Sequence, residues 1–75
     1  MKINVEVFGD LVKYTGFKSR SVDVVSGVTA KDVKVIIGIP LNYPSVILIN
    51  NAICDISKKL EDNDTVKYLM IVNGG

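Results

Sequence analysis

The chain has 75 residues, one cysteine, no histidine and a net charge of +1, and 48% of its residues are hydrophobic. This length favours a single domain, and one cysteine cannot form an internal disulfide, which fits a reducing cytoplasm. Without histidine the chain cannot build a Cys–His or Ser–His couple, and its few scattered carboxylates offer no zinc site. Interspersed charges give little support to nucleic-acid binding, and no apolar run approaches the ~20 residues of a membrane span. We therefore expect a cytoplasmic domain without a bound metal, and chemistry that is done to the chain rather than by it.

The first 25 residues predict two strands. Residues 2–8 alternate between polar and apolar side chains, which is typical of a strand with one buried face. Phe8 shares the parity of the polar residues, so it is expected on the solvent side, either under a loop or as a contact residue. Residues 9–16 form a connector with a glycine at each end, and a second strand is expected over residues 18–25.

A short helix of nine or ten residues is predicted next. Thr29 and Asp32 have the spacing of a capping box, and Gly38 suits the C-terminal cap. The expected buried stripe consists of Ala30, Val33, Ile36 and Ile37, with Lys31 and Lys34 facing solvent.

Two further strands are expected around a tight turn. Residues 45–49 are continuously apolar, as in a central strand covered on both faces. The pair Asn50-Asn51 favours a tight turn because asparagine tolerates a positive φ. In the short strand over residues 52–56, parity places Cys54 in the core and Ile53 on the opposite face.

The last predicted strand covers residues 66–72 and follows an acidic turn at residues 61–64, interpreted as solvated. Lys67 marks the solvent face of this strand. Leu69 and Ile71 share that face, so two apolar residues are expected in solvent beside the end of the sequence.

This order of elements predicts the β-grasp architecture, an α+β roll with a mixed sheet of four to five strands packed on one helix. The whole sequence, residues 1–75, forms one ubiquitin-like domain in this interpretation. Residues 73–75, Asn73-Gly74-Gly75, follow as a flexible tail, because they have no side chain that could bury apolar area. Two terminal glycines place the last carboxylate on a thin stalk that can enter a narrow channel. An ordinary terminus that happens to end in glycine is the alternative.

The chain resembles the MoaD/ThiS family of ubiquitin-like sulfur carriers. The resemblance rests on Asn50-Asn51 at a hairpin, on the turn from Leu60 to Val66 with its L-x-D-x-D-x-V pattern, and on Gly74-Gly75. Two features depart from the family pattern. Asn63 stands where glycine is usual, and the prolines that often precede the tail in the molybdopterin branch are absent before Asn73.

The resemblance implies that a ubiquitin-activating-type adenylyltransferase uses ATP and Mg²⁺ to adenylate the carboxylate of Gly75. A thiocarboxylate then forms, with Gly74 giving access, and its sulfur passes to an acceptor synthase. That acceptor is the large subunit of molybdopterin synthase in one branch and thiazole synthase in the other. Residues matching Phe8, Ile53 and Leu69 help to dock partner enzymes in the molybdopterin branch, and the parity argument places the same residues, with Ile71, on solvent faces.

Three functions remain open from the sequence. The first is a sulfur carrier for molybdopterin, thiamine or related biosynthesis, which is a substrate protein or a small non-catalytic subunit rather than an enzyme. The second is a ubiquitin-like modifier conjugated through Gly75, and the third is a β-grasp binding module with an inert terminus.

Overall fold

A computed structural model describes residues 1–70, and residues 71–75 lie outside its described part. The elements are β1 (Lys2–Val7), the 3-10 helix η1 (Gly9–Leu11), α1 (Val12–Thr15), β2 (Ser19–Asp23), α2 (Ala30–Ile36), β3 (Ser45–Ile49), β4 (Ala52–Ile53) and β5 (Thr65–Met70). Their order agrees with the sequence prediction. The connector between the first two strands contains two short helical turns that were not predicted.

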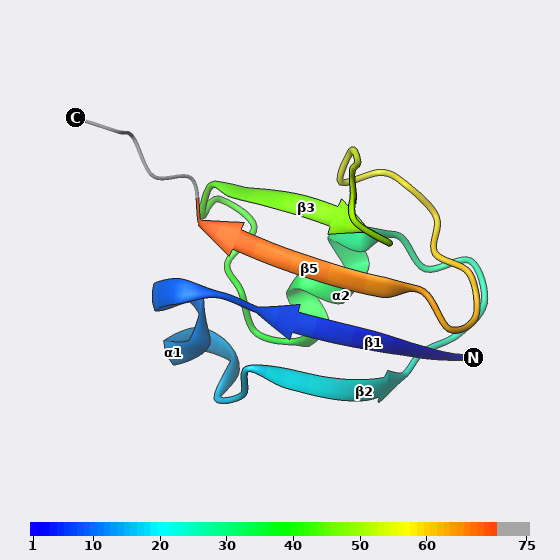
Figure 1. Ribbon diagram of the computed structural model, residues 1–75, viewed down its shortest axis with the longest axis horizontal. Coiled ribbons are helices and arrows are strands. Elements are labelled where there is room, and N and C mark those ends of the chain that lie inside the picture. Colours follow the sequence, from blue (N-terminus) through cyan, green and yellow to red (C-terminus); the bar gives the residue numbers. More distant parts are fainter. Residues whose placement is uncertain (71–75) are drawn as a thin grey trace.

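The strands form one mixed sheet in the order β2-β1-β5-β3-β4 (Figure 1). β1 pairs with β5 in parallel, and the other neighbours pair antiparallel. Helix α2 lies behind one face of this sheet (Figure 1). We call this face the inner face and the opposite one the outer face. This is the ubiquitin-like β-grasp fold, and the predicted fold class is confirmed.

The core lies between the inner face and α2. Tyr68, at the centre of β5, is fully buried, and its hydroxyl donates a hydrogen bond of 2.8 Å to the carbonyl oxygen of Ala30. Burial raises the pKa of this hydroxyl above its ordinary value of 10.0. The central strand and the helix are therefore joined by a polar contact inside an otherwise apolar core.

Helix α2 begins as predicted, and Ala30, Val33 and Ile37 are buried as expected, but Ile36 and Lys34 exchange their predicted environments. Thr29 Oγ1 accepts from the N–H of Asp32 at 3.2 Å, and the Asp32 carboxylate accepts from the N–H of Thr29 at 2.9 Å. Lys34 is only 3% exposed, however, whereas Ile36 is 58% exposed. Counted from Ala30, the buried face contains the positions i+3, i+4 and i+7, and Lys34 is at i+4. Ile36 is at i+6 and therefore points to solvent.

The buried ammonium of Lys34 binds the loop that follows the helix. Its Nζ donates to the carbonyl oxygen of Tyr43 at 2.7 Å and to that of Leu41 at 3.5 Å. Burial lowers the pKa of Lys34. The prediction that Lys34 faces solvent is thus wrong. Its ammonium group instead binds the loop that leads into β3.

Two expectations for β3 and β4 need correction. β3 is covered only on the inner face, because Ile47 and Ile49 are buried while Val46 and Leu48 on the outer face stay half-buried. Cys54 is also half-buried; it packs against the edge of the core and is not inside it. The turn prediction is confirmed, with φ of 50° at Asn50 and 70° at Asn51.

The acidic turn before β5 has a structural role. Asp64 accepts from the N–H of Glu61 at 2.7 Å and from the side-chain amide of Asn50 at 2.9 Å. Asp62 accepts from the N–H of Lys2 at 2.9 Å, and Asn63 adopts a positive φ of 69°. These bonds connect the turn to β1 and to the β3–β4 hairpin. No helix in the described part of the chain is long and apolar enough to cross a membrane.

Candidate partner-docking face

The outer face carries an apolar surface that no described helix covers. Cross-strand register sets Val46 beside Leu69 and sets Leu48 beside Ile53. Phe8 directly follows β1 and donates its N–H to the carbonyl oxygen of Tyr68 at 3.1 Å, so it lies beside Leu69. We call this set the outer patch: Phe8, Val46, Leu48, Ile53 and Leu69.

The structure places on this one face the three residues of the described chain that the sequence predicted to contact partners. Phe8 is 41% exposed, Ile53 is 79% exposed and Leu69 is half-buried on the same face. Val46 and Leu48 were missed, because their continuously apolar strand was interpreted as covered on both sides. Knowledge that β3 pairs with β5 would have placed both residues on the solvent-exposed face that carries Lys67 and Leu69.

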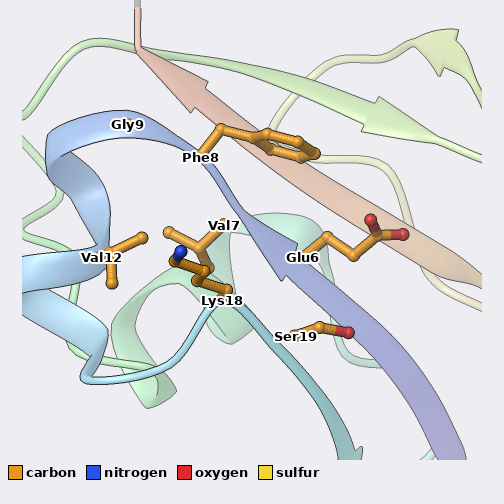
Figure 2. Close-up of a pocket in the computed structure, with 7 residues that line it drawn as sticks. All are labelled: Glu6, Val7, Phe8, Gly9, Val12, Lys18 and Ser19. Carbon is orange, nitrogen blue, oxygen red and sulfur yellow. The ribbon is translucent and has the colours of Figure 1, made fainter.

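A shallow hollow of about 540 Å³ adjoins the outer patch at Phe8 (Figure 2). It lies between the end of β1 and the beginning of β2, and the Phe8 side chain extends from it toward β5. Its lining is Glu6, Val7, Phe8, Gly9, Val12, Lys18 and Ser19. A protruding side chain of a partner can therefore contact the Phe8 ring at a site flanked by both a carboxylate and an ammonium group.

Lys67 lies in the middle of the outer patch. Register places Glu6 on one side of Lys67 and Leu48 on the other. The Nζ of Lys67 donates to the side-chain oxygen of Asn51 at 2.9 Å, in the β3–β4 turn. The patch thus surrounds one cation that has a carboxylate, Glu6, beside it, so it presents apolar side chains with nearly balanced charge to a partner.

The end of β5 is held by the turn that follows β1. The N–H of Asp10 donates to Met70 Sδ at 3.2 Å. Gly9, with a φ of 64°, lies so close that an added Cβ would be 3.3 Å from this sulfur. This contact fixes the last described residue of β5 beside the outer patch. The predicted site residues Ile71, Gly74 and Gly75, and the predicted tail over residues 73–75, lie outside the described residues.

Within residues 1–70 there is no group of three or more His, Cys, Asp or Glu side chains that could hold a metal ion. The carboxylates of Asp32 and Asp55 have lowered pKa values because they accept hydrogen bonds from Thr29 and Ser57, respectively. Both are loop and cap residues. Neither carboxylate belongs to the outer patch.

The chain matches no protein-family model and no curated protein sequence. Among solved structures it is similar to SAMP1 from Haloferax volcanii, with a TM-score of 0.77, 18% identity and 100% of each chain covered. A putative molybdopterin converting factor subunit 1 from Pyrococcus furiosus gives a TM-score of 0.74 and 16% identity over 93% of this chain and 98% of that chain.

A third similar structure is a chain in the complex of subunits 1 and 2 of molybdopterin-converting factor from Helicobacter pylori. Its TM-score is 0.66 and its identity 21%, with 100% of each chain covered. At these identities the likeness is one of fold. It confirms, at the level of the fold, the resemblance that the turn and glycine motifs indicated.

Proposed function

We propose that this protein is a ubiquitin-like sulfur carrier whose reactive group is the α-carboxylate of Gly75. In this proposal a partner enzyme adenylates Gly75, a sulfur donor converts it to a thiocarboxylate, and an acceptor enzyme takes the sulfur. The chain acts as a substrate protein, or as the small non-catalytic subunit of a synthase, and the outer patch is the surface on which its partners dock.

The observation that carries the proposal is the position of the outer patch along the chain. Leu69 belongs to the patch and lies in β5, whose last residue is Met70, and the sequence then continues as Ile71-Val72-Asn73-Gly74-Gly75. An enzyme that binds the outer patch therefore contacts the strand that leads directly to Gly75. Binding at the patch can thereby position the Gly75 carboxylate in the active site, although glycine has no side chain that the enzyme could recognise.

Activation is needed because a carboxylate is a poor electrophile. An α-carboxyl group with a pKa of about 3.5 is ionised at pH 7. Its oxygen attacks the α-phosphorus of ATP and releases pyrophosphate, which gives an acyl adenylate. A sulfide-type nucleophile then attacks the Gly75 carbonyl carbon, and AMP leaves with the former carboxylate oxygen.

The ATP and Mg²⁺ belong to the partner in this scheme. In this proposal the activating enzyme binds the nucleotide and its cation. The contribution of this chain is the outer patch, on which the partner docks, and the small residues Gly74 and Gly75 that can enter the active site.

The complex from Helicobacter pylori supports an acceptor that resembles subunit 2 of molybdopterin-converting factor. In that reading the acceptor binds the outer patch after the activating enzyme has left. Thiazole synthase remains the acceptor proposed for the thiamine branch.

A second candidate function is protein modification through Gly75. It is favoured by the similarity to SAMP1, and a further structure of the Haloferax volcanii protein calls it small archaeal modifier protein 1. Both functions begin with the same adenylation. They differ in the nucleophile, which is sulfur for the carrier and a lysine amine for the modifier.

Exchange of labelled pyrophosphate into ATP tests the adenylation step. The purified chain is incubated with the adenylyltransferase of its own source, ATP and Mg²⁺, beside a variant that lacks Gly75. The variant ends in a chemically equivalent carboxylate that is about 3.5 Å short of its place, and such a shift can lower the rate about a hundredfold. Equal exchange by the two proteins contradicts the proposal.

A further inference from the structure

β2 forms a free edge of the sheet. Within residues 1–70 it pairs with β1 and with no other described strand, as the order β2-β1-β5-β3-β4 shows (Figure 1). Just outside the ends of β2, the carbonyl oxygen of Lys18 accepts from the N–H of Val7, and the N–H of Val24 donates to the carbonyl oxygen of Met1. Hydrogen-bonded pairs alternate along an antiparallel ladder, so Arg20 and Val22 also point their N–H and C=O groups toward β1.

The same alternation leaves three residues with outward-pointing backbone groups: Ser19, Ser21 and Asp23. Two of them are serines, and β2 contains no proline, so the N–H groups on this edge are available as donors. Such an edge is a template for another extended strand.

A groove runs beside this edge, between β2 and helix α2. Its volume is about 360 Å³. Its lining comes from β2, from the end of α1 and the loop that follows it, and from the end of α2: Thr15, Phe17, Arg20, Ser21, Val22, Asp23, Ile36 and Ile37. Ile36 is the helix residue that the sequence predicted to be buried, and its exposed side chain contributes to the groove wall.

Arg20 gives the groove its charge. Its register with the buried Val5 places its side chain on the inner-face side of β2, and its guanidinium lies 4.6 Å from the Phe17 ring centroid. Asp23 lines the same groove but pairs with Lys2, so its side chain belongs to the outer face. The side chains that β2 directs toward α2 are therefore one cation and one valine.

We propose that the β2 edge and this groove bind an extended peptide segment of another protein as an added strand. Alternate residues of that segment are apolar and fill the space between Val22 and Ile36, and one residue on the same face is acidic and pairs with Arg20. The backbone of the segment bonds to Ser19, Ser21 and Asp23.

The positive charge of Arg20 favours an acidic peptide over a second copy of this chain as the occupant of the groove. If two copies paired through β2, each would direct Arg20 and Val22 toward the groove of the other. The shared seam would then hold two arginines without a carboxylate on that face, which is unfavourable for pairing. A segment with an acidic residue supplies the missing charge.

This surface is separate from the outer patch and requires neither adenylation nor Gly75. The groove lies on the side of β2 that faces α2, whereas the outer patch lies across β1, β5, β3 and β4 on the opposite face. The inference thus adds a non-covalent recognition site to the proposed carrier, and it stands or falls independently of that function.

The test uses acetylated synthetic peptides that alternate isoleucine and threonine. A glutamate replaces one isoleucine, at the amino end in one peptide and at the carboxyl end in a second, so that both strand directions are covered. Titration into the ¹⁵N-labelled full chain is followed by amide chemical shifts. We expect shifts at Ser19, Ser21 and Asp23 and slower hydrogen exchange of their amides in at least one titration.

Two variants on one helix give a matched comparison. Ile36→Asp, in the groove wall, is expected to weaken binding about tenfold, because it removes apolar contact at the centre of the site. Val35→Asp changes a neighbouring residue that is 53% exposed and lies outside the groove lining, and it should alter affinity by less than about twofold. Arg20→Glu is expected to reverse the preference, so that a lysine-bearing peptide binds better than the glutamate-bearing one.

Three results would overturn the proposal. The first is an absence of shifts at the β2 edge with both peptides, and the second is an equal effect of Ile36→Asp and Val35→Asp. The third is sedimentation of the free chain as a dimer that Ile36→Asp dissociates, which would assign the edge to a second copy. Folding of each variant is verified by its amide spectrum.

Discussion

Leu69→Asp separates docking from folding. Leu69 is half-buried on the outer face, where Phe8 and Val46 flank it, and it does not belong to the core beneath the sheet. Complete burial of a leucine contributes about 1.5–3 kcal/mol, so the half-burial here contributes about 1 kcal/mol to folding. A domain with the usual stability of at least about 5 kcal/mol remains folded after that loss.

The expected effect on docking is larger. A central apolar residue of an interface typically costs about 2 kcal/mol or more when it is removed, and this corresponds to a roughly thirtyfold weaker complex. Aspartate adds the desolvation of a carboxylate, although Lys67 two residues away on the same face offsets part of this. We therefore expect at least thirtyfold weaker binding to the adenylyltransferase, with the melting temperature lowered by only a few degrees.

The measurement is isothermal titration calorimetry with the adenylyltransferase, accompanied by thermal unfolding of each free variant. Val35→Asp is the control, because Val35 is exposed on α2 and thus behind the sheet. If both variants bind equally well, the outer patch is not the docking surface. If Leu69→Asp is unfolded, the side chain belongs to the core and the argument from exposure is wrong.

Other predictions concern the core, the turn and the tail. Tyr68→Phe removes the donor to Ala30 and should cost about 1–2 kcal/mol in chemical denaturation at pH 7. The parent should also lose stability as the pH rises above 10, because the unfolded state releases the Tyr68 proton first; a denaturation series showing the same loss in the variant would contradict this. Asn63→Val forces a β-branched residue to a φ of 69° and should cost about 1–2 kcal/mol, whereas Asn63→Gly should be nearly neutral by thermal melting. An alanine added after Gly75 overshoots by about 3.5 Å and should reduce pyrophosphate exchange about a hundredfold without changing the melting temperature; unimpaired exchange would refute a requirement for tail length.

The sequence predicted the fold because local signals agreed with one another. The capping box at Thr29 and Asp32, the positive φ at Asn50 and Asn51, and the alternation that exposes Phe8 all occur as expected. Each of these features depends on residues close together in the chain. Periodicity and turn chemistry are therefore sufficient to identify them.

The failures arose where tertiary packing decides. Lys34 is buried because its stem lies on the packed face of α2 while its ammonium reaches the carbonyls of Leu41 and Tyr43. Leu41 and Tyr43 lie outside the helix, so the periodicity of the helical segment cannot indicate these contacts. Val46 and Leu48 were missed for the same reason, since an apolar strand does not show which of its faces another element covers.

Intact mass spectrometry after reaction tests the central claim most directly. The chain is incubated with its adenylyltransferase, ATP, Mg²⁺ and a sulfide source, and a parallel reaction omits ATP. Replacement of one carboxylate oxygen by sulfur adds about 16 Da, and fragmentation should locate the increase at Gly75 in the complete reaction alone. A separate control verifies that the enzyme consumes ATP with a known substrate. If the mass of this chain is then still unchanged, the account is contradicted.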